Sequence, residues 1–185
     1  YNLGGELQTT TVTPDSIYVK PLPLLTLDYF LEKDVLADDA FTPEVEPAVP
    51  VTLGVRVKNN GAASGTGLKI DSAQPTLPEN KQGLLIGFNI IGSNVNEQPS
   101  TNSLLIDFGE IKPNEATMGR WDMVTTLSGR FTEFTADFSH ADDLGGRLTS
   151  IIDPAGINTH TLVRNVLVDV AGRDFVRDFL AFDDP

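Results

Sequence analysis

Hydrophobic and polar residues alternate with a period of two along much of the chain, which is the pattern of half-buried β-strands. In residues 51–58 (VTLGVRVK), four aliphatic side chains share one face and polar side chains occupy the other, with Gly54 neutral between them. Asn59, Asn60 and Gly61 follow with turn chemistry that tolerates positive φ. We therefore predict a half-buried antiparallel strand that ends at this turn.

Comparable segments, separated by turn residues, recur through the rest of the chain. Under strict alternation Phe131 falls on the face opposite Phe134 and Phe138, which a bulge near Thr132 would reconcile. Residues 153–156 (DPAG) read as a turn, and no segment of helical period exceeds one or two turns. The pattern predicts an all-β fold, an Ig-like antiparallel β-sandwich. The further predicted strands are 24–31, 67–70, 84–91, 103–108, 117–126, 131–138, 149–152 and 161–170.

The two ends of the chain depart from this pattern and suggest three segments. Residues 1–23 are predicted to form an extra N-terminal strand or hairpin, with a short strand at 17–19, and then a stiff proline-containing linker. Residues 24–172 form the predicted sandwich. Residues 173–185 read as a short C-terminal connector, and the apolar side chains at positions 175, 176, 179 and 180 have helical spacing. A short helix is therefore one expectation for the connector.

Composition excludes several classes of function. The 26 acidic residues outnumber 13 basic ones and leave a formal charge of −13, so nucleic acid is not an expected partner. The absence of cysteine rules out disulfides, thiolate metal sites and thiol catalysis. No apolar run is long enough for a transmembrane helix, so we expect no membrane insertion. The absence of a starting Met suggests a processed product or a piece of a longer protein.

Several segments resemble one family of bacterial modules. The strand-turn-strand sequence VTLGVRVKNNGAASGTGLKI, with its Val-Lys-Asn-Asn-Gly element, is similar to the CARDB group (cell adhesion related domain found in bacteria) and related Ig-like modules. The resemblance covers residues 24–170 and implies an Ig-like sandwich within a large modular, secreted or cell-surface protein. It implies no catalytic residues. The segments that carry it are 51–70, 108–113 and 119–121, with a longer pattern in 38–47, 72–88 and 140–146.

Acidic residues gather in one proline-rich loop. Calcium prefers several oxygen ligands from a constrained loop, so this cluster is a candidate calcium site, with a solvated acidic loop as the alternative. The spacing lacks the alternating Asp pattern of an EF-hand. A second acidic stretch, 142–146 (DDLGG), is read as a turn rather than as a second site. The candidate metal ligands are Asp34, Asp38, Asp39, Glu44 and Glu46.

Candidate catalytic groups are few. The two histidines, His140 and His160, can be combined with Ser139 and either Asp142 or Asp143 into a hypothetical triad, but no Gly-x-Ser-x-Gly elbow accompanies them. Polar strand positions are the simpler interpretation of both histidines. Carboxylate pairs for glycoside hydrolysis can likewise be drawn from Glu110, Asp122 and Glu133, although such pairs arise by chance in an acidic chain. An enzyme is therefore the least favoured function.

Three hypotheses remain for the function. The leading one is a non-enzymatic spacer or adhesion-type module, located outside the cell or at its surface, whose partners are neighbouring domains of the same polypeptide and a protein or glycan. The second is an accessory carbohydrate- or ligand-binding module, which would expose Trp121 as a stacking platform instead of burying it in the core. The third is a self-assembling fibre subunit whose residues 1–20 pair with a neighbouring chain.

Overall fold

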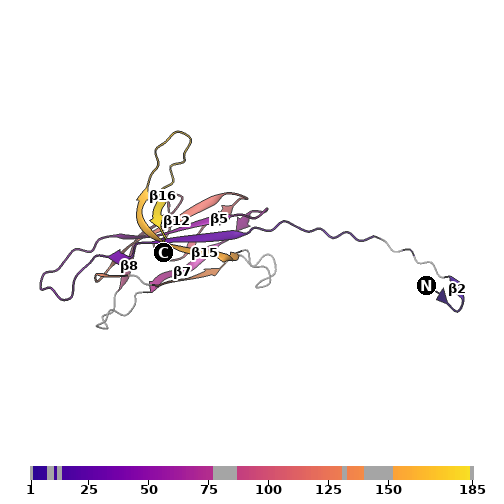
Figure 1. Ribbon diagram of the computed structural model, residues 1–185, viewed down its shortest axis with the longest axis horizontal. Helices are drawn as coiled ribbons and strands as arrows, with labels where there is room; N and C mark the ends of the chain where they lie inside the picture. Colours follow the sequence, from indigo (N-terminus) through magenta and orange to yellow (C-terminus); the bar gives the residue numbers. More distant parts are fainter. Residues whose placement is uncertain are drawn as a thin grey trace.

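The fold is all-β, as the alternation predicts. The computed structural model describes residues 2–7, 11, 14–76, 87–130, 133–139 and 152–183, and every regular element among them is a β-strand (Figure 1). The predicted strands at 51–58 and 117–126 are confirmed as β5 and β12. The predicted bulge near Thr132, the start of the 84–91 strand and most of the 149–152 strand lie outside the described residues.

One large sheet dominates the body. Its seven strands run in the order β16-β15-β3-β5-β12-β8-β9. Neighbours are antiparallel except β15 and β3, which run parallel, with Ile157 opposite Leu27 and Thr161 opposite Leu31. The sheet is therefore mixed rather than purely antiparallel. Its strands are β16 (Asp178–Phe182), β15 (Ile152–Val166), β3 (Leu25–Leu31), β5 (Val51–Asn59), β12 (Ala116–Thr125), β8 (Phe88–Val95) and β9 (Gln98–Pro99).

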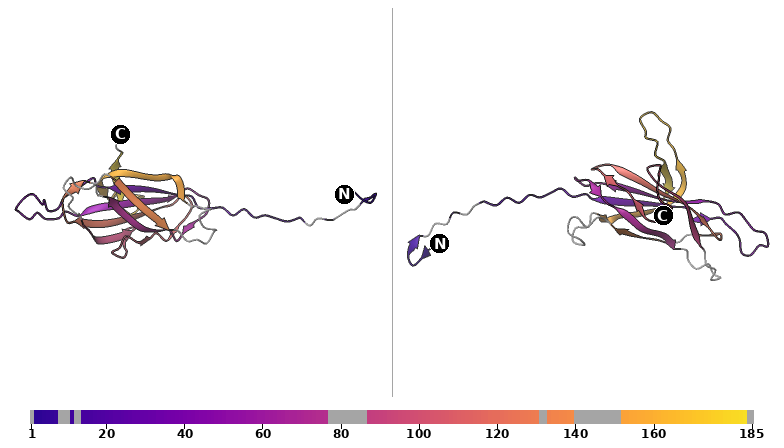
Figure 2. Two further views of the ribbon diagram at one scale, coloured as in Figure 1. Left: turned by 90° about the horizontal axis from the view of Figure 1, so that it is seen from below. Right: turned by 180° about the vertical axis from the view of Figure 1, so that it is seen from behind.

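A smaller sheet covers one face of the large one (Figure 2). It consists of three strands in the order β10 (Ile106–Asp107), β7 (Lys69–Thr76) and β14 (Glu133–Ser139). We call the covered face of the large sheet its inner face and the opposite face its outer face. Two-stranded pairs complete the described fold: β6 (Gly65–Thr66) with β11 (Glu110–Ile111), β4 (Asp34–Val35) with β13 (Gly129–Arg130), and β1 (Asn2–Leu3) with β2 (Glu6–Leu7).

The core lies between the large and the small sheet. Alternate residues of β3, β5 and β12 point inward, as the period-two pattern requires, and meet apolar side chains from β10 and its flanking loops. Trp121 is fully buried there, and its indole nitrogen donates to the carbonyl of Ser103 at 3.0 Å. The members of the core include Leu25, Leu27, Tyr29, Val51, Leu53, Val55, Val57, Leu68, Ile106, Phe108, Ile111, Trp121 and Met123.

Asn59 organises the point at which the chain enters the body. Its buried side chain accepts hydrogen bonds from the backbone of Leu24 and Gly61 and donates to the carbonyls of Ala63 and Ile111. A Cβ on Gly61 would lie 2.3 Å from the backbone nitrogen of Leu24, so only glycine permits this close approach. The Asn-Asn-Gly turn therefore holds the start of β3 in addition to ending β5.

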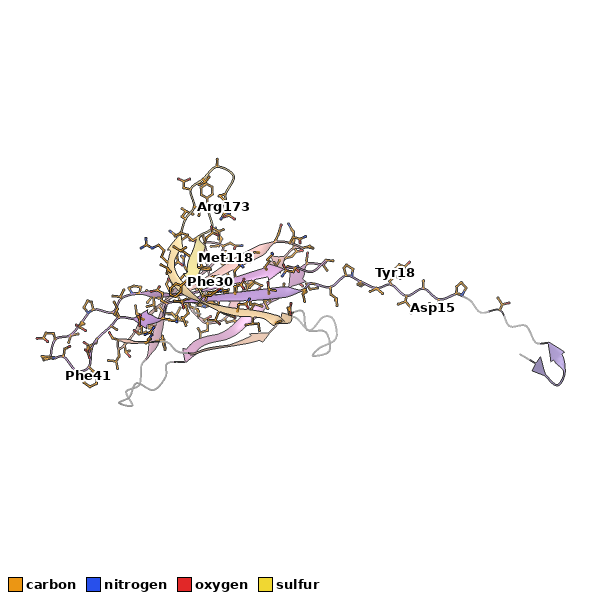
Figure 3. All side chains as sticks on the ribbon, in the orientation of Figure 1. Asp15, Tyr18, Phe30, Phe41, Met118 and Arg173 are labelled. Carbon is orange, nitrogen blue, oxygen red and sulfur yellow. The ribbon has the colours of Figure 1, made fainter. Side chains whose placement is uncertain are left out.

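Residues 14–24 form an extended N-terminal arm rather than the predicted short strand at 17–19. The arm belongs to no described strand ladder and runs away from the body (Figures 1 and 3). Ile17, Tyr18 and Val19 are 89, 87 and 91% exposed. The prediction failed because local β-propensity forms a strand only where a neighbouring strand supplies backbone partners. An N-terminal hairpin does exist, as β1 and β2 around Gly4 and Gly5.

The C-terminal prediction of a short helix is wrong. Residues 178–182 form strand β16, antiparallel to β15, so they belong to the large sheet instead of forming a free connector. The segment also fits a strand, because its side chains alternate in burial and Phe179 is more buried than Leu180. Backbone pairing with β15 stabilises the strand over the helix. The predicted boundary at residue 172 stays a prediction.

The predicted turn at 153–156 lies inside a longer strand. Asp153 accepts a hydrogen bond from the backbone of Ala155 at 3.0 Å, which is turn chemistry, but β15 continues through it. The pairing with β3 shifts register between Ile152 and Ile157, so the sheet absorbs the turn as an irregularity.

Candidate functional site

The outer face of the large sheet carries the most organised polar side chains of the described residues, and a C-terminal strap crosses it. We define the C-terminal strap as residues 172–183, which include β16. The ring of Phe179 packs directly over Gly54 of β5, where a Cβ would lie 2.5 Å from two ring carbons. Phe30 stacks on Phe179 with ring centroids 4.7 Å apart and on His160 with centroids 5.1 Å apart. These aromatic contacts dock the strap on β3 and β5.

Asp28 is the buried centre of an ion-pair network beside this stack. Its carboxylate accepts hydrogen bonds from Nε and Nη2 of Arg56, at 3.0 and 2.6 Å, and from Nδ2 of Asn158 at 2.9 Å. His160 lies 3.6 Å from the same carboxylate and also contacts the carboxylate of Asp183. Burial alone would raise the pKa of Asp28, but the hydrogen bonds from Asn158 and Arg56 outweigh it and lower the pKa.

A second polar group lies further along the same face. The hydroxyl of Thr52 donates to Asp122 at 3.1 Å and accepts from the side-chain amide of Asn165 at the same distance. The backbone nitrogen of Thr52 donates to Glu32 at 3.0 Å. Burial raises the pKa of the Glu32 carboxyl, and the nearby negative charge of Asp122 raises it further. The hydrogen bond from the backbone of Thr52 lowers this pKa but does not outweigh the other two effects. Asn165 thereby attaches β15 to β5 across the bend that leads to the strap.

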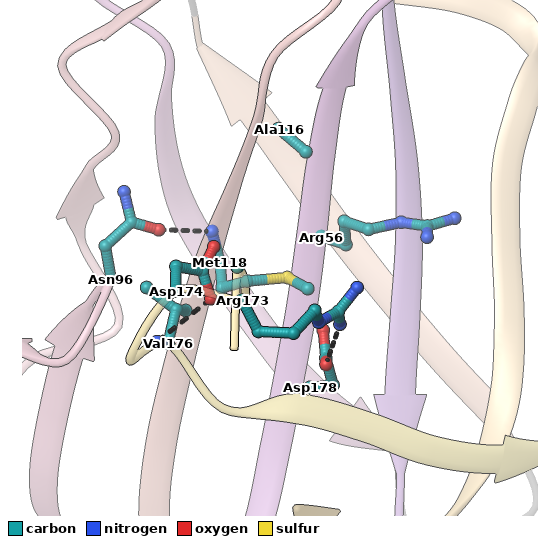
Figure 4. A pocket seen from close by; sticks show the side chains of 9 residues that line it. Arg56, Asn96, Ala116, Met118, Arg173, Asp174, Val176 and Asp178 are labelled. Carbon is teal, nitrogen blue, oxygen red and sulfur yellow. Dashed lines mark hydrogen bonds and ion pairs between the residues drawn. The ribbon is translucent and has the colours of Figure 1, made fainter. Parts of the chain in front are cut away.

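Glu97 holds the strap at Arg177, directly before β16. Its carboxylate pairs with Arg120 of β12 at 3.0 Å and with Arg177 of the strap at 2.5 Å. Between the strap and the sheet is a pocket of about 430 Å³ whose walls include Arg56 and Met118 from the sheet and Arg173 and Asp178 from the strap (Figure 4). Arg173 and Asp178 pair with each other at 2.5 Å, so the pocket's charges are largely balanced internally.

The five predicted calcium ligands lie along one exposed excursion but do not converge. The carboxylate of Asp34 lies 3.7 Å from Nε of Arg130. The carboxylate of Asp39 accepts a hydrogen bond from the backbone nitrogen of Phe41, which lies near the tip of the excursion (Figure 3). The carboxylate of Asp38 accepts a hydrogen bond from the backbone nitrogen of Glu46 at 3.0 Å. Glu44 and Glu46 are exposed. Within the described ranges, no three acidic or histidine side chains gather as a metal site would require, and calcium stays a prediction.

The candidate catalytic groups are not assembled by the described residues. His140, Asp142 and Asp143 lie outside those residues, as does the DDLGG segment, and the side chains of Ser139 and Glu133 are not described. His160 contacts two carboxylates and an aromatic ring. Glu110 and Asp122 stand on strands of different sheets, β11 and β12. His160 and Asp122 are thus held by contacts with neighbouring side chains on the outer face.

Sequence reasoning missed the outer face because it treated that face as solvent-exposed. Two signals were present. Gly54 interrupts an otherwise well-packed strand, and a glycine inside a strand often marks the close approach of another element. Tyr29 and Phe30 are consecutive aromatics on β3, so one of them had to point outward, where it needed a cover.

No described segment is a helix of the length and apolar character that crossing a bilayer requires. A comparison with protein-family models, with curated proteins and with solved structures finds no match to this chain.

Proposed function

We propose that this chain is a non-enzymatic structural module, a spacer that transmits tension and also offers surfaces for interaction, in a large secreted or cell-surface protein. The observation that carries the proposal is where the chain enters and leaves the folded body. The arm joins β3 at Leu25, and β16 ends at Phe182, which is opposite Thr161 and, through it, Leu31. Entry and exit are therefore at opposite ends of β3, about 20 Å apart for a seven-residue strand (Figure 1).

Tension between these points would run along the strands. Because β16 runs antiparallel to β15, force at Phe182 opens the β15–β16 pairs first, whereas the bonds between the parallel strands β3 and β15 are then loaded together in shear. Six registered residue pairs join β3 to β15, and the aromatic stack of Phe30 on Phe179 resists release of the strap from β3. A spacer needs this property, because survival under force depends on the rate of unfolding rather than on equilibrium stability alone.

Two alternatives fare differently. A carbohydrate-binding role through Trp121 is disfavoured, because that side chain is fully buried and offers no stacking surface. A self-assembling role gains support from the detached, exposed arm, which is the arrangement that donation of a strand to a neighbour requires. The resemblance to CARDB-like modules and the extracellular or surface location remain part of the proposal, as does the prediction that the chain is not an enzyme.

Single-molecule force spectroscopy tests the spacer role. The chain lacks cysteine, so handles can be attached specifically through Asp15→Cys in the arm and a cysteine appended after Pro185. The matched control pairs Asp15→Cys with Ala62→Cys, because Leu25 faces Asn59 in antiparallel register and force there opens β3 from β5 pair by pair. We expect a higher unfolding force in the first geometry at equal loading rate. Equal or lower force would remove the load-bearing role.

A further inference from the structure

The N-terminal arm has the properties of a strand without a partner. From Asp15 to Lys20 it is extended and exposed, with three consecutive apolar residues between an acidic and a basic one. Asp15 and Tyr18 project from the arm into solvent (Figure 3). Within residues 15–20 the one side-chain hydrogen bond is local, from the backbone of Ser16 to Asp15. An apolar strand with free backbone groups is a donor for pairing with another sheet.

The body offers an acceptor edge at β16. This strand is the last in the order of the large sheet and has β15 as its one strand neighbour. Leu180 and Phe182 are each 51% exposed on it, and the neighbouring Val163 of β15 is 50% exposed. No charged side chain interrupts residues 179–182, although natural edge strands commonly carry charges that discourage pairing.

The other edges with described side chains are less suitable. At the opposite end of the large sheet, β9 has two residues, and one of them is Pro99, which has no backbone donor. The adjacent edge of β8 is partly covered, because the carbonyls of Ser93 and Ile91 accept hydrogen bonds from Ser100 and Asn102. In the small sheet β10 also has two residues. Among these edges, β16 is the long and apolar one.

Charges favour a parallel alignment of arm and edge. The arm's apolar residues lie between Asp15 and Lys20, and β16 lies between Arg177 and Asp183. Parallel pairing places the acidic end of the arm near Arg177 and Lys20 near Asp183. Antiparallel pairing brings Asp15 toward Asp183 instead. In the parallel register Tyr18 lies beside Leu180 on the exposed side of the ribbon.

We propose that residues Asp15–Lys20 of one copy add as a parallel strand to the free edge of β16 in a second copy. Donor and acceptor are different surfaces, so the contact is heterologous and repeats head to tail. The proposal deepens the interaction role proposed above, whereas the force experiment uses isolated molecules, so either can fail alone. The same arm folded back onto its own β16 is the competing arrangement that the test must separate.

Mixing of complementary variants of the full chain is the test. Tyr18→Pro removes the central backbone donor of the arm, and Leu180→Lys places a charge on the exposed edge. In sedimentation velocity we expect wild type to form concentration-dependent oligomers and each variant to associate at least about tenfold more weakly. An equimolar mixture should recover dimers that do not grow, because one variant keeps the edge and the other keeps the arm. Val45→Lys, at an 89% exposed position outside both surfaces, should associate like wild type.

A disulfide assay identifies the contact directly. Copies carrying Tyr18→Cys are mixed with copies carrying Leu180→Cys under mild oxidation, and no other thiol is present. We expect more mixed disulfide than from Tyr18→Cys with Val45→Cys, although Val45 is the more exposed position. A monomeric wild type, no preference over the Val45 control, or a concentration-independent intrachain disulfide in a Tyr18→Cys/Leu180→Cys chain would each overturn the proposal. Unchanged Trp121 fluorescence shows that the variants are folded.

Discussion

Gly54→Ala tests whether the strap docks on the sheet through Phe179. The new Cβ would lie 2.5 Å from two ring carbons of Phe179, a distance that real Cβ contacts essentially never show, so the ring or the strap must move. Inserting a methyl group into packed surroundings costs about 1–3 kcal/mol. For a chain of this size each kcal/mol corresponds to a shift in Tm of about 2–4 °C, so we expect a fall of roughly 2–12 °C.

A second background, Phe179→Ala, separates the clash with the ring from other effects of Gly54→Ala. Phe179→Ala removes the ring, and because Phe179 is only half-buried it should cost about 2 kcal/mol, below the range for fully buried phenylalanine. Once the ring is absent, Gly54→Ala meets no clash and restricts the unfolded chain, so it should stabilise by about 0.5–1 kcal/mol. The sign of the same substitution reverses, and the double-mutant cycle gives an interaction energy of about 1.5–4 kcal/mol.

The assay is urea and thermal unfolding followed by the fluorescence of Trp121, the single tryptophan, which is fully buried in the folded state. Gly92→Ala on β8 is the matched control, because its Cβ would lie 3.7 Å from the nearest atom, an Asp122 oxygen, and should be close to neutral. An unchanged midpoint for Gly54→Ala, or the same cost in both backgrounds, would show that Phe179 does not occupy this position.

Three further predictions use the same unfolding assay. Asp28→Asn should destabilise the protein at pH 7 by about 1–3 kcal/mol. Because folding lowers the pKa of Asp28, the stability difference between wild type and variant should shrink as the pH falls below about 4 through the folded pKa, and a difference that is constant with pH would contradict this. Glu32→Gln should behave oppositely, because the raised pKa of Glu32 in the folded state means that its ionisation opposes folding. The variant should therefore become more stable relative to wild type as the pH rises through that pKa, and no such stabilisation at pH 7 would count against the prediction. For the acidic excursion 34–46, the predicted calcium site implies a higher unfolding midpoint in calcium than in a chelator, and an unchanged midpoint would remove that prediction.

The period-two pattern predicted the centre of the sheet well. Apolar and polar side chains alternate along residues 51–58 and 117–126. Each of these strands can bury its apolar face in the core regardless of which strand pairs with it. Trp121 lies on the buried face of β12, in step with this alternation. These features depend on local sequence and on one buried face, which is the information that a single chain carries most directly.

Pairing between distant segments could not be predicted in this way. Nothing local to residues 178–182 indicates that β15 will supply backbone partners, so helical spacing looked equally good there. The Asp28 network joins residues on β3, β5 and β15, and none of them stands in a recognisable motif. The exposed arm is the converse case, because Ile17 to Val19 have strand propensity and lack a neighbour within the described body.

The parallel pairing of β3 with β15 also sets an order of events during synthesis. Leu27 pairs with Ile157, 130 positions later in the chain. At translation rates of roughly 5–20 residues per second, the first strand of the sheet waits about 6 to 26 seconds for its neighbour. During that interval β3 can pair with β5 alone, and its other edge is open to nascent chains nearby. Contacts of such high sequence separation also slow folding, so the large sheet closes last along the seam between β3, its earliest strand, and the C-terminal pair of β15 and β16.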